Sequence, residues 1–168
     1  MSIKKVLYII LFSIVFNIAS AEENLKSLGK FKDWKSFVLV QDENKICFAQ
    51  SKPLVRAPKK LKRGESRLFV TFRPAEKIKD EISVTNGYEF QKQKPVTAKS
   101  GKKIYGLFSK GRFAWLSDGE EEKQLIKTMK KASRLMIIGN INEDSQTTDH
   151  YSMMGFTKAY NAAKKSCG

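Results

Sequence analysis

The sequence predicts a mainly β fold with one short internal helix and a C-terminal helix. Seven short runs carry Val, Ile, Phe, Tyr or Trp at strand-like density, at residues 31–40, 45–51, 67–73, 81–85, 102–108, 112–116 and 134–141. Gly, Pro, Asn and Asp separate these runs, as turns require. The composition, 41% hydrophobic and 29% charged over 168 residues, is that of one globular domain.

Two dipeptides in this pattern predict hairpin turns. Asn86-Gly87 and Lys110-Gly111 each place a glycine between two strand-like runs. Glycine supplies the positive φ that short hairpin turns need. We therefore expect each dipeptide to join two paired strands.

Two segments predict helices. The first follows a capping-box pattern from Ser117 to Glu120 and has an apolar face of Leu125, Ile126 and Met129. The acidic run 120–122 is predicted to be the solvated start of this helix, where negative charge complements the helix dipole. The second helix follows Ser152, its expected N-cap. Its apolar stripe, spaced 3, 4, 3 and 4 residues apart, comprises Met153, Phe156, Tyr160, Ala163 and Cys167.

The first 21 residues predict a secretory signal peptide. Lys4 and Lys5 precede an apolar run, and the small residues 19–21 give a cleavage site between Ala21 and Glu22. The apolar run is shorter than the roughly 20 residues that span a bilayer. The mature chain, residues 22–168, is therefore expected in the periplasm or outside the cell, with no transmembrane span and a formal charge of +13.

Export changes the interpretation of the two cysteines. In an oxidising compartment, Cys47 and Cys167 are predicted to form a disulfide, whereas two unpaired thiols are the alternative. If Ile46 and Phe48 point to the face of a strand opposite Cys47, the disulfide ties the C-terminal helix to a sheet.

Most catalytic chemistry finds no support in the sequence. One histidine and two cysteines do not make a four-ligand zinc site, and phosphate-binding glycine motifs and a G-x-S-x-G elbow are absent. Ser100 to Lys103 matches S-x-x-K, but a lysine-rich chain produces such matches freely. We predict no catalytic residue, no metal site and no cofactor.

His150 lies next to Asp149 and close to Ser152, which invites comparison with a catalytic triad. Neighbours in sequence do not generally converge on one reacting atom, so we interpret His150 as a surface histidine. A pair of carboxylates in a cleft, as glycoside hydrolysis needs, is not visible in a sequence.

Positive charge is the strongest functional signal. Residues 52–67 hold seven Lys or Arg against one acid, and residues 91–112 hold seven against none. Such runs attract polyanions, although Lys also accumulates on any solvated surface. An exported protein meets nucleic acid rarely, so an anionic envelope polymer, lipid head groups or another protein is the expected partner. The candidate anion-binding residues, expected on at least one connected surface, are Lys59, Lys60, Lys62, Arg63, Lys99, Lys102 and Lys103.

Several motifs resemble the invasion-associated locus B family of bacterial secreted proteins. They are Asp33-Trp34, Cys47, the run 73–76, Gly87-Tyr88, the run 148–159 and Cys167, and Tyr-Ser-x-x-Gly-Phe-Thr-x-Ala from Tyr151 is the most specific. The resemblance covers residues 31–168. It implies an immunoglobulin-like β-sandwich in the periplasm of alphaproteobacteria, with no agreed enzymatic activity. Some members carry a further cysteine shortly after the Trp, and residues 35–40 have none here.

The sequence thus predicts an exported, non-enzymatic envelope or host-interaction protein that binds an anionic surface or partner. A small periplasmic hydrolase or catalytic accessory is the alternative. A third class, a small-ligand carrier, needs a deep apolar pocket, and Trp34, Trp115 and Phe113 are as well suited to a core as to such a pocket.

Overall fold

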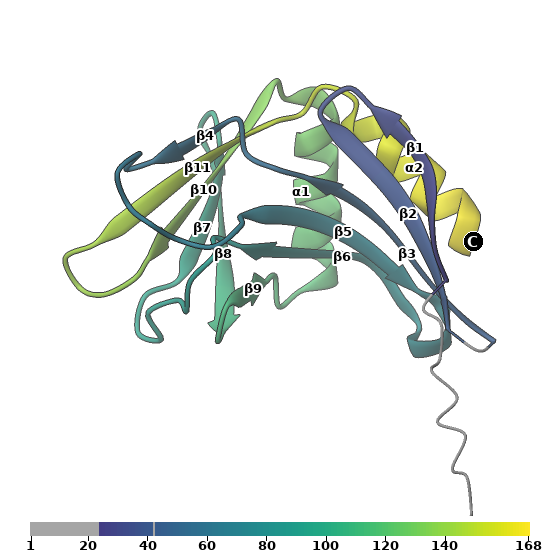
Figure 1. Cartoon of the computed structure of the whole chain (residues 1–168), viewed down its shortest axis with the longest axis horizontal. Helices are drawn as coiled ribbons and strands as arrows, with labels where there is room; N and C mark the ends of the chain where they lie inside the picture. Colours follow the sequence, from purple (N-terminus) through teal and green to yellow (C-terminus); the bar gives the residue numbers. More distant parts are fainter. Residues whose placement is uncertain (1–23, 42) are drawn as a thin grey trace, which may run out of the picture.

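The computed structural model describes residues 24–41 and 43–168 (Figure 1). The predicted signal peptide and its cleavage site lie outside the described residues. The strands are β1 (Asn24–Phe31), β2 (Trp34–Gln41), β3 (Asn44–Ser51), β4 (Val55–Ala57), β5 (Arg67–Arg73), β6 (Ile78–Thr85), β7 (Val96–Ser100), β8 (Lys103–Lys110), β9 (Phe113–Trp115), β10 (Arg134–Asn140) and β11 (Gln146–Ser152). The helices are α1 (Gly119–Lys131) and α2 (Phe156–Cys167), with a 3-10 turn at Pro74–Glu76.

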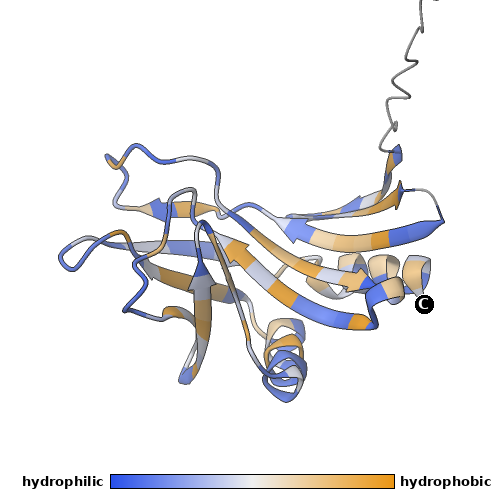
Figure 2. Ribbon diagram, turned by 90° about the horizontal axis from the view of Figure 1, so that it is seen from below, coloured by the Kyte–Doolittle hydropathy of each residue, from blue (hydrophilic) through white to orange (hydrophobic). Residues whose placement is uncertain are grey.

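The eleven strands form one bent sheet in the order β1-β2-β3-β5-β6-β9-β8-β7-β10-β11-β4. We call β1-β2-β3-β5-β6-β9 the first half-sheet and β8-β7-β10-β11-β4 the second. Side chains alternate along each strand, so one face of each half-sheet points into the core and the other points outward. The helices lie on the inner side of the bend (Figures 1 and 2). The expected mainly β, sandwich-like fold with an internal and a C-terminal helix is therefore confirmed.

Helix α2 covers the inner face of the first half-sheet. The indole of Trp34 packs against Phe156 at a tilt, with ring centroids 4.8 Å apart, and its Nε1 donates a hydrogen bond to the Ser152 carbonyl (2.8 Å). Cys47 is fully buried on β3 and forms a disulfide with Cys167 at the end of α2. The structure thus bears out the predicted pairing and its place between the helix and the sheet.

Both predicted helix starts are displaced by one to three residues. Asp118, not Ser117, caps α1, and its side chain accepts a hydrogen bond from the Glu120 N–H (2.9 Å). Ser152 is the last residue of β11 rather than an N-cap, because the chain turns through two further residues before Gly155 opens α2. Gly155 has φ +91°, and a Cβ there would collide with the Phe31 carbonyl.

The strand predictions are confirmed from residue 45 onward, with small shifts at the ends. The predicted strand 31–40 is confirmed as β2 from residue 34 onward, whereas its first three residues form the end of β1 and a turn in which Lys32 has φ +54°. Strands β4, β7 and β11, and most of β1, were not predicted. Strand β11 is Gln-Thr-Thr-Asp-His-Tyr-Ser and is largely polar, so it lacks the apolar alternation that marks a strand.

One of the two predicted hairpins is confirmed. Strands β8 and β9 pair from Lys110 to Phe113 across a two-residue turn in which Gly111 has φ +60°. The hairpin at Asn86-Gly87 is wrong, since β6 pairs with β5 and β9 rather than with the next strand. Asn86 is buried instead, and the Gly87 carbonyl accepts a hydrogen bond from the Gly64 N–H (2.9 Å).

Candidate anion-binding cleft

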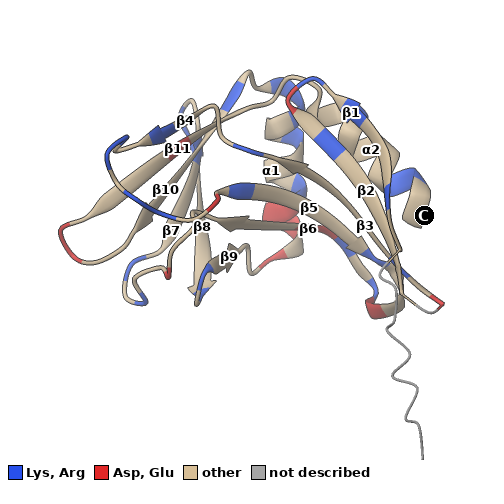
Figure 3. Cartoon of the chain, viewed as in Figure 1, with Lys and Arg blue, Asp and Glu red and all other residues tan. Residues whose placement is uncertain are grey.

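The predicted basic residues lie in two separate groups. Residues that pair across neighbouring strands of the second half-sheet form rows, and Lys99 of β7 lies in the same row as Val55 of β4. The chain leaves this row in opposite directions after β4 and after β7. The exposed Lys59, Lys60 and Lys62 follow β4, whereas Lys102 and Lys103 lie at the β7–β8 turn. The two groups therefore follow opposite ends of the row. Figure 3 shows Lys and Arg over both half-sheets and both helices.

Arg63 is not a surface residue. Its side chain is 2% exposed and forms an ion pair with Asp149, which is fully buried. The guanidinium also donates to the Asn86 carbonyl (2.9 Å) and to the Ser66 hydroxyl (3.1 Å). Because these contacts engage the guanidinium inside the protein, it is not available to an external anion. The prediction that Arg63 is an anion-binding residue is therefore wrong.

The structure gathers a different set of cations around one cleft. The cleft lies where the β1–β2 turn meets the end of β3 and the start of β5, and it has a volume of about 410 Å³. Five basic side chains line it against a single carboxylate. The lining residues are Lys30, Lys32, Asp33, Lys35, Phe37, Gln50, Ser51, Lys52, Pro53, Leu54 and Arg67, and we call this site the basic cleft.

Two of the five basic side chains are paired with a carboxylate that does not itself line the cleft. Glu65 forms ion pairs with Lys52 (2.7 Å) and with Arg67. Hydrogen bonds from Lys52 and then Arg67 lower the pKa of Glu65 to about 2, so this carboxylate stays charged. Within the described part of the chain, no ion pair or hydrogen bond engages the amino groups of Lys30, Lys32 and Lys35. These three ammonium groups remain available to an anion.

The basic cleft also has an apolar wall, made by Phe37, Pro53 and Leu54. Leu54 is 67% exposed at the rim. Phe37 stacks on Phe48 with ring centroids 5.3 Å apart. The cleft therefore combines free positive charge with exposed apolar surface.

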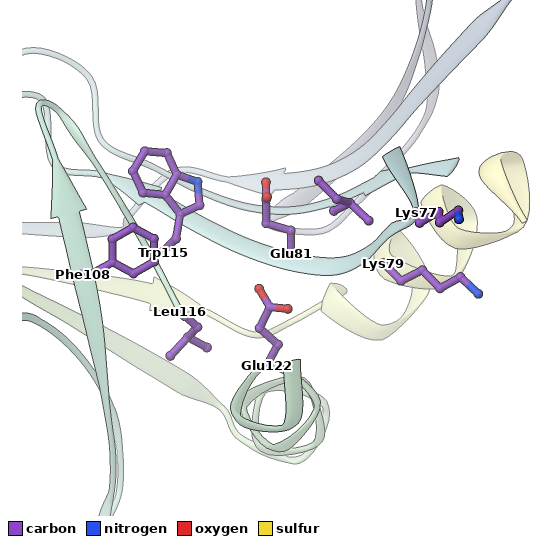
Figure 4. Close-up of a pocket in the computed structure, with 8 residues that line it drawn as sticks. Lys77, Lys79, Glu81, Phe108, Trp115, Leu116 and Glu122 are labelled. Atoms are coloured by element: carbon purple, nitrogen blue, oxygen red, sulfur yellow. The ribbon is translucent and has the colours of Figure 1, made fainter. Parts of the chain in front are cut away.

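A second hollow, of about 530 Å³, lies where β6, β9 and the start of α1 meet (Figure 4). Glu81 and Glu122 both line it, to one side of the rings of Trp115 and Phe108. Arg73 holds Glu81 through two hydrogen bonds of 3.0 and 2.9 Å, and this pairing raises the pKa of Arg73 above its ordinary value.

The neighbouring Glu122 has a different environment. Burial raises the pKa of Glu122 to about 7, and the nearby Glu81 charge adds to the rise against the hydrogen bond from the Ile82 N–H (3.1 Å). The prediction that residues 120–122 form only a solvated helix start is therefore wrong for Glu122. The signal for its burial was in the sequence, since Glu122 lies four residues before Ile126 on the apolar stripe.

The triad-like cluster around His150 does not converge. Asp149 and His150 are consecutive on β11 and point to opposite faces, with Asp149 buried and His150 half-buried on the outer face. Of the aromatic residues weighed for a ligand carrier, Trp34 fills the core, while Trp115 lies between Phe108 and Phe113 on the outside.

The described residues contain neither a metal-binding cluster nor a helix that could span a membrane. No three His, Cys, Asp or Glu side chains of residues 24–41 and 43–168 are grouped so that they could hold a metal ion. Neither α1 nor α2 has the length and apolar character needed to cross a bilayer.

The fold and the cleft define an antiparallel β protein with a basic groove, and a comparison with solved structures finds a similar fold. The chain resembles the crystal structure of invasion associated protein b from Bartonella henselae, with a TM-score of 0.60 over 84% of this chain and 96% of that chain. The two sequences are 13% identical, so the likeness establishes a shared fold. No family model and no curated protein sequence matches the chain.

Proposed function

We propose that this chain is an exported, non-enzymatic protein of the invasion-associated locus B type that binds an anionic surface through the basic cleft. The observation that carries the proposal is the group of free ammonium ions of Lys30, Lys32 and Lys35 at one cleft. The fold shared with invasion associated protein b supports the type of protein. The disulfide supports export, because such bonds persist in oxidising compartments.

The binding proposal is tested with a soluble sulfated polysaccharide and the mature chain. Binding should weaken steeply as salt rises, since exposed charges are screened over about 8 Å at 0.15 M ionic strength. Changing Lys30, Lys32 and Lys35 to Gln should weaken binding by roughly 100-fold, at about 1 kcal/mol for each lysine near an anionic surface.

The matched control changes Lys59, Lys60 and Lys62 to Gln, which removes the same charge from an exposed loop. This control should lower the affinity only a few-fold. Equal losses in the two triple variants would contradict the assignment to the cleft. Salt-insensitive binding that both variants retain would reject the anion-binding function itself.

The export part of the proposal is tested by the intact mass of the protein in the periplasmic fraction. The expected chain begins at Glu22, after cleavage of the leader. Recovery in membranes of a chain that begins at Met1 would contradict it.

A second candidate function, a small periplasmic hydrolase, has one observation in its favour. Glu81 is held as an ion pair while the pKa of Glu122 is raised to about 7, and two carboxyl groups in different protonation states are a common arrangement for acid–base catalysis. Turnover of glycoside or ester substrates that Glu122→Gln abolishes would favour this function over binding.

A further inference from the structure

We infer that the outer face of the first half-sheet docks on a lipid bilayer that carries anionic head groups. This inference rests on the proposed function and names the class of surface that the basic cleft meets. The bilayer would receive apolar side chains of the sheet at the level of its head groups, while the lysines of the cleft contact its phosphates.

The outer face of strands β2, β3 and β5 is apolar where a solvated sheet face is usually polar. Phe37 lies directly across from Phe48, and Leu39 from Ile46. Phe69 lies diagonally across from Phe48 on β5, with their ring centroids 6.2 Å apart. All five of these side chains are half-buried, and we call them the apolar face.

Neither helix covers the apolar face. Helix α2 is tied to the opposite, inner face by the disulfide at Cys47 and by the hydrogen bond from Ser36 to the Ala159 carbonyl (2.7 Å). Figure 2 shows the helices on one side of this half-sheet and its other side open. Contiguous apolar surface of this kind on a monomer marks a site of interaction.

Exposed leucines extend the apolar face at two places. Leu25 of β1, 54% exposed, pairs with Leu39 across the strand. Leu54, 67% exposed, lies at the rim of the basic cleft. Both side chains contact water over most of their surface and gain the most from transfer into an apolar medium.

The lysines lie on the same face. The register places Lys30 opposite Lys35, Lys35 opposite Gln50, and Gln50 opposite Phe69. This row runs directly beside the pair Phe37 and Phe48. Cations therefore border the apolar face at the end where Leu54 projects.

This combination favours a bilayer over the other partners. Aromatic and aliphatic side chains beside Lys are typical of protein surfaces that lie in the head-group region, where each lysine adds about fivefold to binding on an anionic leaflet. A soluble polyanion would use the lysines and leave Leu54 in water. A second copy stacked on this face would bring two sets of free lysines together, and like charges oppose such contacts.

The test measures binding of the mature chain to vesicles of phosphatidylcholine alone and of phosphatidylcholine with phosphatidylglycerol. Binding should require the anionic lipid. Leu25→Ser, on the apolar face but outside the basic cleft, should weaken binding to the anionic vesicles roughly fivefold and leave binding to the soluble sulfated polysaccharide unchanged. Ile104→Ser is the matched control, because Ile104 is 65% exposed on the second half-sheet, and it should change neither.

A second variant reports insertion directly. The emission of Leu54→Trp should shift to the blue on the anionic vesicles and be quenched by brominated lipid. The reference is the parent chain, whose own emission comes from the buried Trp34 and the half-buried Trp115. Unshifted emission, or full vesicle binding by Leu25→Ser, would overturn the bilayer inference. In that case, loss of polysaccharide binding in the Lys30, Lys32 and Lys35 variant would still support the proposed function. A concentration-dependent dimer that Leu25→Ser dissociates would also overturn the bilayer inference, because a second copy would then cover the face.

Discussion

The buried pair of Arg63 and Asp149 gives the sharpest test of how this fold is held together. Arg63 reaches from the loop between β4 and β5 to Asp149 on β11 and to the Asn86 carbonyl after β6. One guanidinium thus connects the two half-sheets. The side chains are 2% and 0% exposed, so either charge would be left without water if the other were removed.

The size of the effect follows from this burial. Removing one partner of a buried ion pair typically costs about 3–5 kcal/mol, because the remaining charge is uncompensated. Arg63→Met also leaves the Asn86 carbonyl without its guanidinium donor, so we expect a loss near the upper end of that range. Replacing both partners, in Arg63→Met with Asp149→Leu, should cost less than either single change, since an apolar pair leaves no buried charge.

The assay is equilibrium unfolding in urea, followed by tryptophan fluorescence, which comes from the buried Trp34 and the half-buried Trp115, with the disulfide intact. A domain of this size has about 5–15 kcal/mol of stability, so the variants stay folded without urea when the stability of the parent exceeds about 5 kcal/mol. Lys59→Met on the same loop is the control and should stay within about 0.5 kcal/mol of the parent. If Arg63→Met matches Lys59→Met, or the double variant loses the sum of the single losses, the argument from the buried charge is refuted.

Three further predictions concern single residues. Cys167→Ser should lower stability by about 2–5 kcal/mol, because the disulfide closes a loop of 120 positions in the unfolded chain, and two free thiols in unfolded, unreduced protein would contradict the bond. Gly155→Ala should lower the melting temperature through about 1–3 kcal/mol of backbone strain together with the collision at Phe31, whereas Gly101→Ala, where a Cβ meets nothing within 4 Å, should have the smaller effect. Stability should fall as the pH rises from about 4.5 to about 7, because Glu122 binds its proton more tightly in the folded state than in the unfolded state, and Glu122→Gln should flatten this slope in thermal unfolding at a series of pH values. An unchanged slope in that variant would assign the pH dependence to other groups.

The sequence was most informative where one local pattern coincided with one element. The 3, 4, 3, 4 stripe ending at Cys167 predicted the buried face of α2, and Phe156, Tyr160 and Ala163 are indeed buried. Strand β5 was predicted at its observed limits, because apolar residues fill a short run between turns. The polar strand β11 was missed, because its polar residues are paired with residues distant in sequence. Asp149, for example, is bound by Arg63.

The candidate site was likewise predicted only in part from the sequence. The sequence identified the excess of positive charge but placed it on the longest basic runs, at residues 52–67 and 91–112. The free lysines of the basic cleft come instead from residues 30–35, where no run is conspicuous, and the fold brings them to the end of β3. Glu122 joined Glu81 in a hollow only because α1 packs against the edge of β6.

The sequence by itself determined the fold class, the helices and the pairing of the two cysteines, because periodicity, turn chemistry and the count of thiols are local or exhaustive properties of a chain. Only the tertiary structure decided which charges are free. Arg63 and Lys62 are adjacent in sequence, yet one is buried against a carboxylate and the other is exposed to water. The difference arises from a partner 86 positions away, and the effective charge of a side chain depends on such partners and on burial rather than on residue type.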